Sequence, residues 1–246
     1  MSGPFSPARG DYSSLARVSQ PLPTMRRYMT SYLSADGDVC YDDVRAPAAP
    51  EFQCAFNALA HGSLVATTEG EVAIEDLRPG MMVTTREHGP QPVLWIGSMT
   101  HAPDPNGAQF LTRVTADRFA AGAPPLDLLC GPGARLLHRP ASLRSSADHK
   151  PVYTPLRDFV DGDSVIAIAP RMAVDTYHIA LKRHATIRVG GLDLETFHPG
   201  MTVLDQMGAN TRDLFVSMFP HIRRATDFGP LAHPRVTLRT IEDAAA

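Results

Sequence analysis

The chain has 246 residues, of which 43% are hydrophobic and 20% charged, and its net charge is −3 at pH 7. These values are ordinary for a globular protein of one or two domains, and the mixed charges form no basic stripe of the kind that nucleic-acid binding requires. No segment approaches the ~18 apolar residues of a membrane span, and the N-terminus has no apolar core of a Sec signal. We therefore expect no nucleic acid and no membrane as partners, and a cytoplasmic location; the alternative is secretion by a signal-independent exporter.

The cysteines and acidic clusters predict neither a cofactor nor a metal. Cys40, Cys54 and Cys130 are odd in number and widely spaced, which gives no disulfide framework and no Cys-x-x-Cys metal pair. The aspartates around Cys40 lack the twelve-residue frame of a calcium loop, so a solvated turn is the expected structure there.

The first 54 residues are rich in Pro, Ser, Ala and Asp. This composition predicts a largely disordered N-terminal arm, in which Met25 to Leu33 could form a short helix.

From residue 62 to 98 the pattern changes to short apolar alternations that end at Gly or Pro, such as the turns at Glu69-Gly70 and Pro79-Gly80. Strands this short, bounded by turn residues, predict the hairpins of an all-β domain. A second such unit follows at residues 126–140, where a Gly-Pro-Gly turn separates two apolar runs, and the pair Asp161-Gly162 predicts another hairpin turn.

The C-terminal part has helical signals. Asn210 or Thr211 is a suitable N-cap, an apolar stripe follows it, and Pro220 ends the segment. The last residues predict a second short helix.

The segment that begins at Gly62 resembles the opening of a Hint domain, the hedgehog/intein autoprocessing fold, in the variant of bacterial stand-alone Hint proteins. The resemblance implies an all-β horseshoe or disc of curved β-hairpins with pseudo-two-fold symmetry over residues 55–204, followed by a helical C-terminal tail over residues 205–246. Ten positions fall on the family frame without a gap: Gly62, Ser63, Val65, Thr67, Gly70, Ile74, Glu75, Leu77, Gly80 and Val83.

The same frame places alanine at two positions where active relatives need reactive groups. The nucleophilic cysteine stands four residues before the glycine, which is Ala58 here, and a methyl group cannot attack a carbonyl. The histidine that protonates the leaving nitrogen corresponds to Ala134, and a nearby hydroxyl position corresponds to Gly131. His138 lies four residues further on and is a weak substitute.

The last family block retains two imidazoles, His178 and His184. Because no nucleophile accompanies them, a hydrogen-bonded structural role is the expected one, and a general acid/base pair is the alternative. The His-Asn pair that completes splicing in inteins is replaced by Leu194, Glu195 and Thr196, which excludes splicing.

These residues predict a degenerate Hint protein that neither splices nor self-cleaves. It would then be no enzyme, but a binding or structural module for an unknown protein partner, of undefined oligomeric state. The alternative is residual N-terminal self-cleavage, an autoproteolysis through a thioester at Cys54 assisted by His178 or His184. A hydrolase in the same cleft is a third possibility, for which the sequence offers no paired nucleophile and base.

Overall fold

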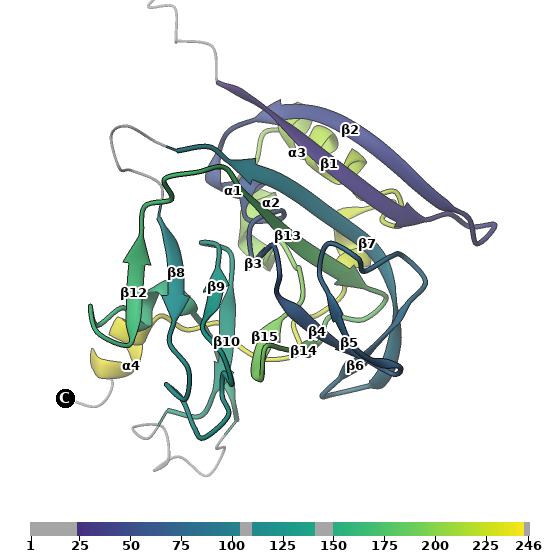
Figure 1. Ribbon diagram of the computed structural model, residues 1–246. Helices are drawn as coiled ribbons and strands as arrows, with labels where there is room; N and C mark the ends of the chain where they lie inside the picture. The colour runs from purple at the N-terminus through teal and green to yellow at the C-terminus, as the bar shows by residue number, and fades with distance from the viewer. Residues whose placement is uncertain (1–23, 104–109, 141–149, 244–246) are drawn as a thin grey trace, which may run out of the picture.

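The computed structural model describes residues 24–103, 110–140 and 150–243, and within them fifteen strands join in one sheet (Figure 1). Neighbouring strands pair antiparallel, in the main order β11-β10-β15-β14-β4-β6-β7-β13-β3-β9-β8-β12. The predicted all-β fold with C-terminal helices is confirmed. The strands are β1 (Met25–Leu33), β2 (Val39–Pro47), β3 (Leu59–Ala60), β4 (Leu64–Thr67), β5 (Gly70–Ala73), β6 (Met82–Thr85), β7 (Gly89–His101), β8 (Leu111–Val114), β9 (Leu128–Cys130), β10 (Arg135–His138), β11 (Val152–Pro155), β12 (Val165–Ile168), β13 (Val174–Leu181), β14 (Thr186–Val189) and β15 (Leu192–Glu195).

The N-terminal segment differs from its prediction. The stretch expected to form a short helix is strand β1, which pairs with β2 on one side and with β7 on the other. Tyr28 and Thr30 are buried and Met29 between them is exposed, which is the two-residue period of a strand. Residues 25–47 of the predicted arm therefore belong to the sheet; the remainder of the arm up to residue 23 lies outside the described residues.

Strand β7 organises the sheet because it pairs with different partners along its thirteen residues. Gly89 to Pro92 pair with β6, and the second half pairs with β13 and with β1. The hairpins that contain the family motif are thereby joined to the N-terminal hairpin by one continuous strand.

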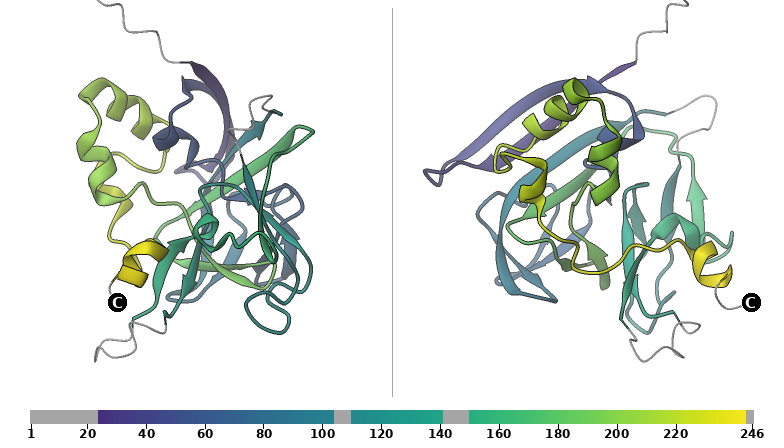
Figure 2. Two further views of the ribbon diagram at one scale, coloured as in Figure 1. Left: turned by 90° about the vertical axis from the view of Figure 1, so that its left-hand side faces the viewer. Right: turned by 180° about the vertical axis from the view of Figure 1, so that it is seen from behind.

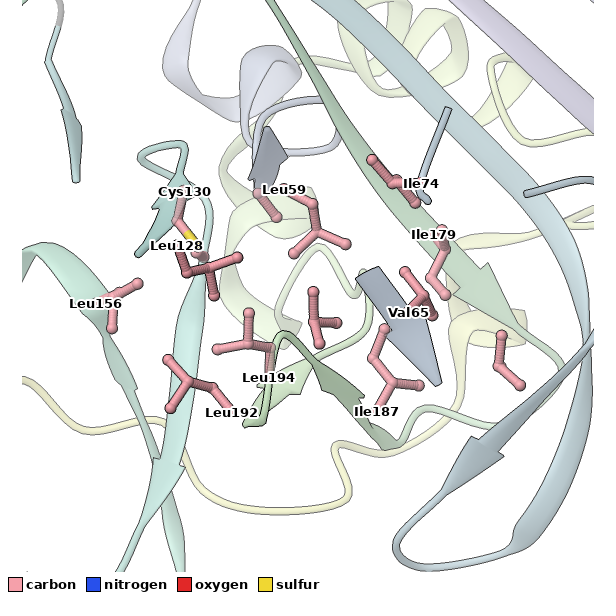
Figure 3. Close-up of a cluster of buried hydrophobic side chains, with 14 of the residues drawn as sticks. Leu59, Val65, Ile74, Leu128, Cys130, Leu156, Ile179, Ile187, Leu192 and Leu194 are labelled. Atoms are coloured by element: carbon pink, nitrogen blue, oxygen red, sulfur yellow. The ribbon is translucent and has the colours of Figure 1, made fainter. Parts of the chain in front are cut away.

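Two apolar cores lie on this scaffold. The first is aliphatic and is built around residues such as Val65, Ile179 and Leu194 (Figure 3). Ala58 and Ala134 also belong to it. The second is aromatic: the rings of Phe197 and Phe219 stack with centroids 5.1 Å apart, and the indole of Trp95 packs against Phe219 at 4.5 Å.

The C-terminal helices cover the aromatic core. The predicted helix forms as α3 (Ala209–Ser217), but its N-cap is Gly208, and the predicted caps Asn210 and Thr211 lie inside its first turn. The indole Nε1 of Trp95 donates to the carbonyl oxygen of Met218 at 2.8 Å just after the helix. Seen from behind, α2 and α3 lie over β1, β2 and β7, and the chain then crosses the molecule to α4 (Figure 2). No helix in the described ranges has both the length and the apolarity needed to cross a membrane. The other short helices are α1 (Pro50–Gln53), η2 (Leu156–Phe159), α2 (Met201–Gln206), η3 (Ala225–Phe228) and α4 (Leu238–Asp243).

Candidate functional site

The peptide bond between Asn57 and Ala58 is held on both sides by backbone hydrogen bonds. The Ala58 N–H donates to the Tyr177 carbonyl at 2.9 Å, and the Asn57 carbonyl accepts from the N–H of Gly133 at 3.1 Å. The Ala58 carbonyl accepts from the N–H of Gly131 at 2.9 Å. The segment before β3 therefore lies directly against the turn between β9 and β10, which carries Ala134.

The turn leaves no space for a side chain at Gly131. A Cβ atom there would lie 1.9 Å from the carbonyl oxygen of Asn57, and one at Gly133 would lie 2.5 Å from the Oδ1 of Asn57. Such separations are far below van der Waals contact, so only glycine fits at either position. Gly131 is the position at which the family resemblance places a hydroxyl.

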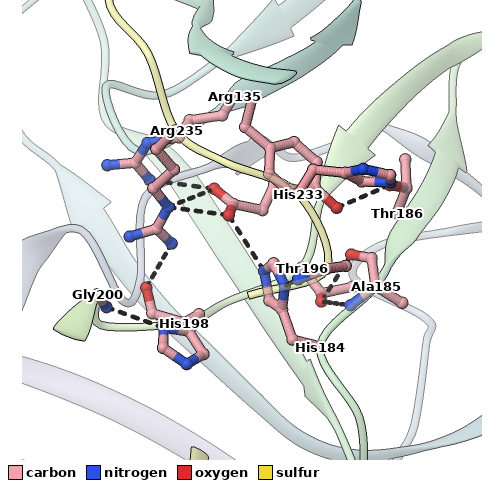
Figure 4. A network of polar contacts seen from close by, with 12 residues as sticks. Arg135, His184, Ala185, Thr186, Thr196, His198, Gly200, His233 and Arg235 are labelled. Carbon is pink, nitrogen blue, oxygen red and sulfur yellow. Dashed lines mark hydrogen bonds and ion pairs between the residues drawn. The ribbon is translucent and has the colours of Figure 1, made fainter. Parts of the chain in front are cut away.

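Close to this turn lies a buried carboxylate, Glu195, at the end of β15, which contacts Arg135 just after the turn. Figure 4 shows the surrounding residues Arg135, His184 and Arg235. The Glu195 side chain is 1% exposed, and Nε of Arg235 lies 2.9 and 3.2 Å from its two oxygens. Nη1 of Arg135, the first residue of β10, lies 3.4 Å from Oε2. Burial alone would raise the pKa of Glu195, but the His184 imidazole and the charges of Arg235 and Arg135 outweigh burial and lower the pKa to about 2. The carboxylate is therefore ionised at neutral pH.

The two histidines predicted as candidates have different surroundings. Nδ1 of His184 accepts the N–H of Ala232 at 2.9 Å, so the ring proton is on Nε2, which lies 3.1 Å from Oε1 of Glu195. His178 is 3% exposed, its ring packs on the edge of Phe197, and burial lowers its pKa to about 3. His178 is thus neutral at neutral pH, and a neutral imidazole is a much weaker proton donor to a leaving group than an imidazolium.

Cys54, the third candidate, lies at the C-terminal end of α1. Its thiol donates to the carbonyl oxygen of Glu51 at 3.2 Å, and burial raises the pKa of the thiol. A nucleophilic cysteine needs the opposite shift, because the thiolate is the reactive form. His138, the weak substitute on β10, is hydrogen-bonded through Nε2 to Thr154 Oγ1 at 2.8 Å.

A segment of the C-terminal tail, Leu231 to Thr237, lies across the site, and we call it the strap. It pairs with β11 through one isolated parallel bridge: the Tyr153 N–H donates to the Pro234 carbonyl at 2.8 Å, and the Val236 N–H donates to the Tyr153 carbonyl at 2.9 Å. In addition to its contacts with Glu195, Arg235 donates through Nη2 to the carbonyl oxygen of His198 at 2.7 Å.

His233 of the strap contacts a second carboxylate, Glu87. Its Nε2 lies 2.7 Å from Oε1 of Glu87, whose oxygens also accept from the N–H and the hydroxyl of Thr186 at 2.7 and 2.6 Å. The Thr186 hydroxyl in turn contacts the buried hydroxyl of Tyr153 at 2.7 Å. The strap is therefore fixed to the sheet at two charged points and by main-chain pairing between them.

Sequence reasoning did not single out Glu195, Arg135 or Arg235 as site residues. Glu195 stands among the residues that replace the His-Asn pair of inteins and Arg135 follows Ala134, so both lie at or beside family block positions. Nothing near Arg235 in the sequence indicates that it contacts a residue forty positions earlier. In the described residues no group of three or more His, Cys, Asp and Glu side chains is arranged to hold a metal ion.

Comparisons with known proteins identify the family of the chain. Residues 57–201, more than half of the chain, match the family described as the Hint domain. Among solved structures, a bacterial intein-like domain from Clostridium thermocellum, determined in solution, is similar at 14% identity and a TM-score of 0.41, covering 58% of this chain and 99% of its own. No curated protein matches the chain significantly. With its motif residues, its hairpin sheet and the family match over residues 57–201, the chain belongs to the Hint domain family.

Proposed function

We propose that this protein is a Hint domain that neither splices nor cleaves itself and that acts as a non-enzymatic binding or structural module for a protein partner. In this proposal the Hint domain spans residues 55–204 and the helical tail spans residues 205–246. The observation that carries the proposal is the steric closure at Gly131, where a Cβ would lie 1.9 Å from the Asn57 carbonyl oxygen. The hydroxyl of an active relative has no place there.

The surroundings of the Asn57–Ala58 bond support the same proposal. Cleavage needs a nucleophile beside this bond and a proton donor for its nitrogen. Ala58 and Ala134 supply neither, and both are packed in the aliphatic core with 1% and 2% exposure. The Ala58 N–H is already held by the Tyr177 carbonyl, so the amide is in a stable hydrogen-bonded arrangement rather than aimed at an acid.

In this proposal the remaining polar groups hold the strands and the strap together. Glu195 joins β15 to β10 through Arg135 and to the strap through Arg235. A buried carboxylate that is matched by such partners specifies one arrangement of the strands around it, because any other arrangement leaves a charge unpaired. The strap also covers the site with main chain that an incoming reactant would have to displace.

Residual self-cleavage at Cys54 is less well supported. The thiol would have to attack the Gln53 carbonyl, and the nitrogen of the Gln53–Cys54 bond is committed to a helical hydrogen bond with the Pro50 carbonyl at 2.9 Å. A protonated thiol that donates to the Glu51 carbonyl is not prepared for this step.

The mass of the intact protein tests the proposal. Purified full-length chain is incubated with a strong thiol and, separately, with hydroxylamine, each of which releases the N-terminal part of any thioester. We expect the full mass alone. A fragment that begins at Cys54 or Ala58 would overturn the proposal, and a Cys54→Ala control identifies whether that thiol is responsible.

A further inference from the structure

A pocket lies in the C-terminal tail, outside the Hint site, between α3 and the residues that follow it. Its volume is about 440 Å³. Val216, Phe219 and Ile222 provide apolar side chains, and three arginines, Arg212, Arg223 and Arg224, line the same pocket. All of these residues lie beyond residue 201, where the family match ends.

The positive charges in this arginine pocket outnumber the negative ones. In residues 24–103, 110–140 and 150–243, none of the three guanidinium groups lies in an ion pair with a carboxylate. One acidic side chain, the exposed Asp213, also lines the pocket. Three like charges around one hollow repel each other, and an anion between them would relieve that repulsion.

The other polar groups near the arginine pocket already form hydrogen bonds within the protein. The Asp227 carboxylate accepts the backbone N–H groups of Arg223 and Arg224 at 3.0 and 2.9 Å, which fixes the backbone that carries these two side chains. The Ser217 hydroxyl donates to the Leu214 carbonyl at 2.7 Å. The donors that remain for a ligand are therefore the guanidinium groups, and two of them stand on a loop that is held in place.

We propose that the arginine pocket binds a phosphate-bearing ligand. A guanidinium group presents parallel N–H donors that match two oxygens of a phosphate, and the tetrahedral dianion can accept from several arginines at once. Val216 and Ile222, both partly exposed, offer contact to an apolar group esterified to the phosphate. Free phosphate and a phosphate ester share this chemistry, and the two are separated by experiment. The proposal does not depend on the function proposed for the Hint site.

Isothermal titration calorimetry of the full chain tests it with two probes, inorganic phosphate and phenyl phosphate. We expect saturable binding that weakens with added sodium chloride, because the contacts are ionic. Tighter binding of phenyl phosphate than of phosphate identifies an ester as the ligand, and equal binding identifies the free anion.

Three variants localise the binding. The double change Arg223→Ala and Arg224→Ala is expected to weaken phenyl phosphate binding by about tenfold or more, because hydrogen bonds to a charged group are lost. Asp213→Asn removes the like charge and is expected to strengthen binding by about twofold. Arg239→Ala, which removes an exposed arginine of α4, is the matched control and should leave binding unchanged.

Absence of saturable binding of both probes overturns the proposal, as does equal binding by wild type and the double variant. Equally tight binding of acetate would also contradict it, since the pocket would then recognise charge and not phosphate. Unfolding curves of the variants, measured without probe, confirm that each remains folded during the titration.

Discussion

Replacing Arg235 by methionine removes the strap's charge from Glu195 while it retains a side chain of similar length. Arg235 supplies the contacts of 2.9 and 3.2 Å to the carboxylate, and the variant leaves Arg135 at 3.4 Å and His184 at 3.1 Å. Loss of one partner from a buried ion pair costs 3–5 kcal/mol, and because two partners remain we expect the lower end, about 3 kcal/mol, at pH 7.

The pH dependence of this loss follows from the direction of the pKa shift. The pKa of Glu195 is lowered from 4.5 to about 2 in the folded state, so the stabilisation is complete above pH 4.5 and is lost as the pH falls towards 2. Between pH 7 and pH 3 the free energy of unfolding of the wild type should fall by about 2 kcal/mol through the titration of Glu195. In Arg235→Met the pKa of Glu195 is expected to return to its ordinary value, so this contribution to the pH dependence disappears. The difference between the two proteins should therefore shrink to about 1 kcal/mol at pH 3.

Urea unfolding followed by far-ultraviolet circular dichroism measures the stability cost of Arg235→Met at pH 7 and at pH 3. Other acidic groups titrate equally in the two proteins, so they cancel in the difference. Arg188→Met, which removes an exposed arginine 3.7 Å from Asp193, is the control and should cost less than about 1 kcal/mol. A cost for Arg235→Met as small as the control's, or one that is the same at both pH values, would refute the assignment of Arg235 as the partner of an ionised Glu195.

Three further changes test the remaining parts of the site. Gly131→Ala forces a methyl group against the Asn57 carbonyl and should destabilise the fold by about 3 kcal/mol in urea unfolding, and a cost below 1 kcal/mol would contradict the close contact. Tyr153→Phe removes the hydroxyl contact to Thr186 and should cost about 1–2 kcal/mol in the same assay; an unchanged midpoint would show that this contact adds nothing. The double change Ala58→Cys and Ala134→His should give slow thiol-dependent cleavage that exceeds the sum of the single variants, measured by intact mass. A crystal structure of that double variant with the thiol and imidazole too far apart to touch would contradict the alignment of both positions.

The hairpins of the Hint region could be predicted because their signals are local. Glycine and proline mark each turn between residues 62 and 98, and the apolar alternation between them sets which face is buried. The turn at Gly131 was likewise visible as Gly-Pro-Gly, although its close approach to Asn57 was not, because that contact joins segments seventy residues apart.

The N-terminal hairpin and the strap could not be predicted for the same reason. The stretch from Met25 to Leu33 contains residues that tolerate a helix, and its strand conformation depends on pairing with β2 and β7. The sequence around Arg235 and His233 has no pattern that distinguishes them from other residues of a polar tail. Their role is set by carboxylates 40 and 146 positions earlier in the chain, and single-sequence patterns carry no information about such distances.

The position of the strap in the chain also determines when the contacts of Glu195 and Glu87 can form during synthesis. Glu195 is made forty residues before Arg235, and Glu87 is made 146 residues before His233. Until the strap has left the ribosome, the Glu195 carboxylate on β15 lacks its contact with Arg235. During the same time Tyr153 on β11 lacks its main-chain pairing with the strap. The hairpins around Gly62 can form early from local contacts, whereas the charged contacts of Glu195 and Glu87 cannot be completed until the strap has been translated. The carboxylates of Glu195 and Glu87 therefore gain their full set of partners only after all residues of the Hint match have been made.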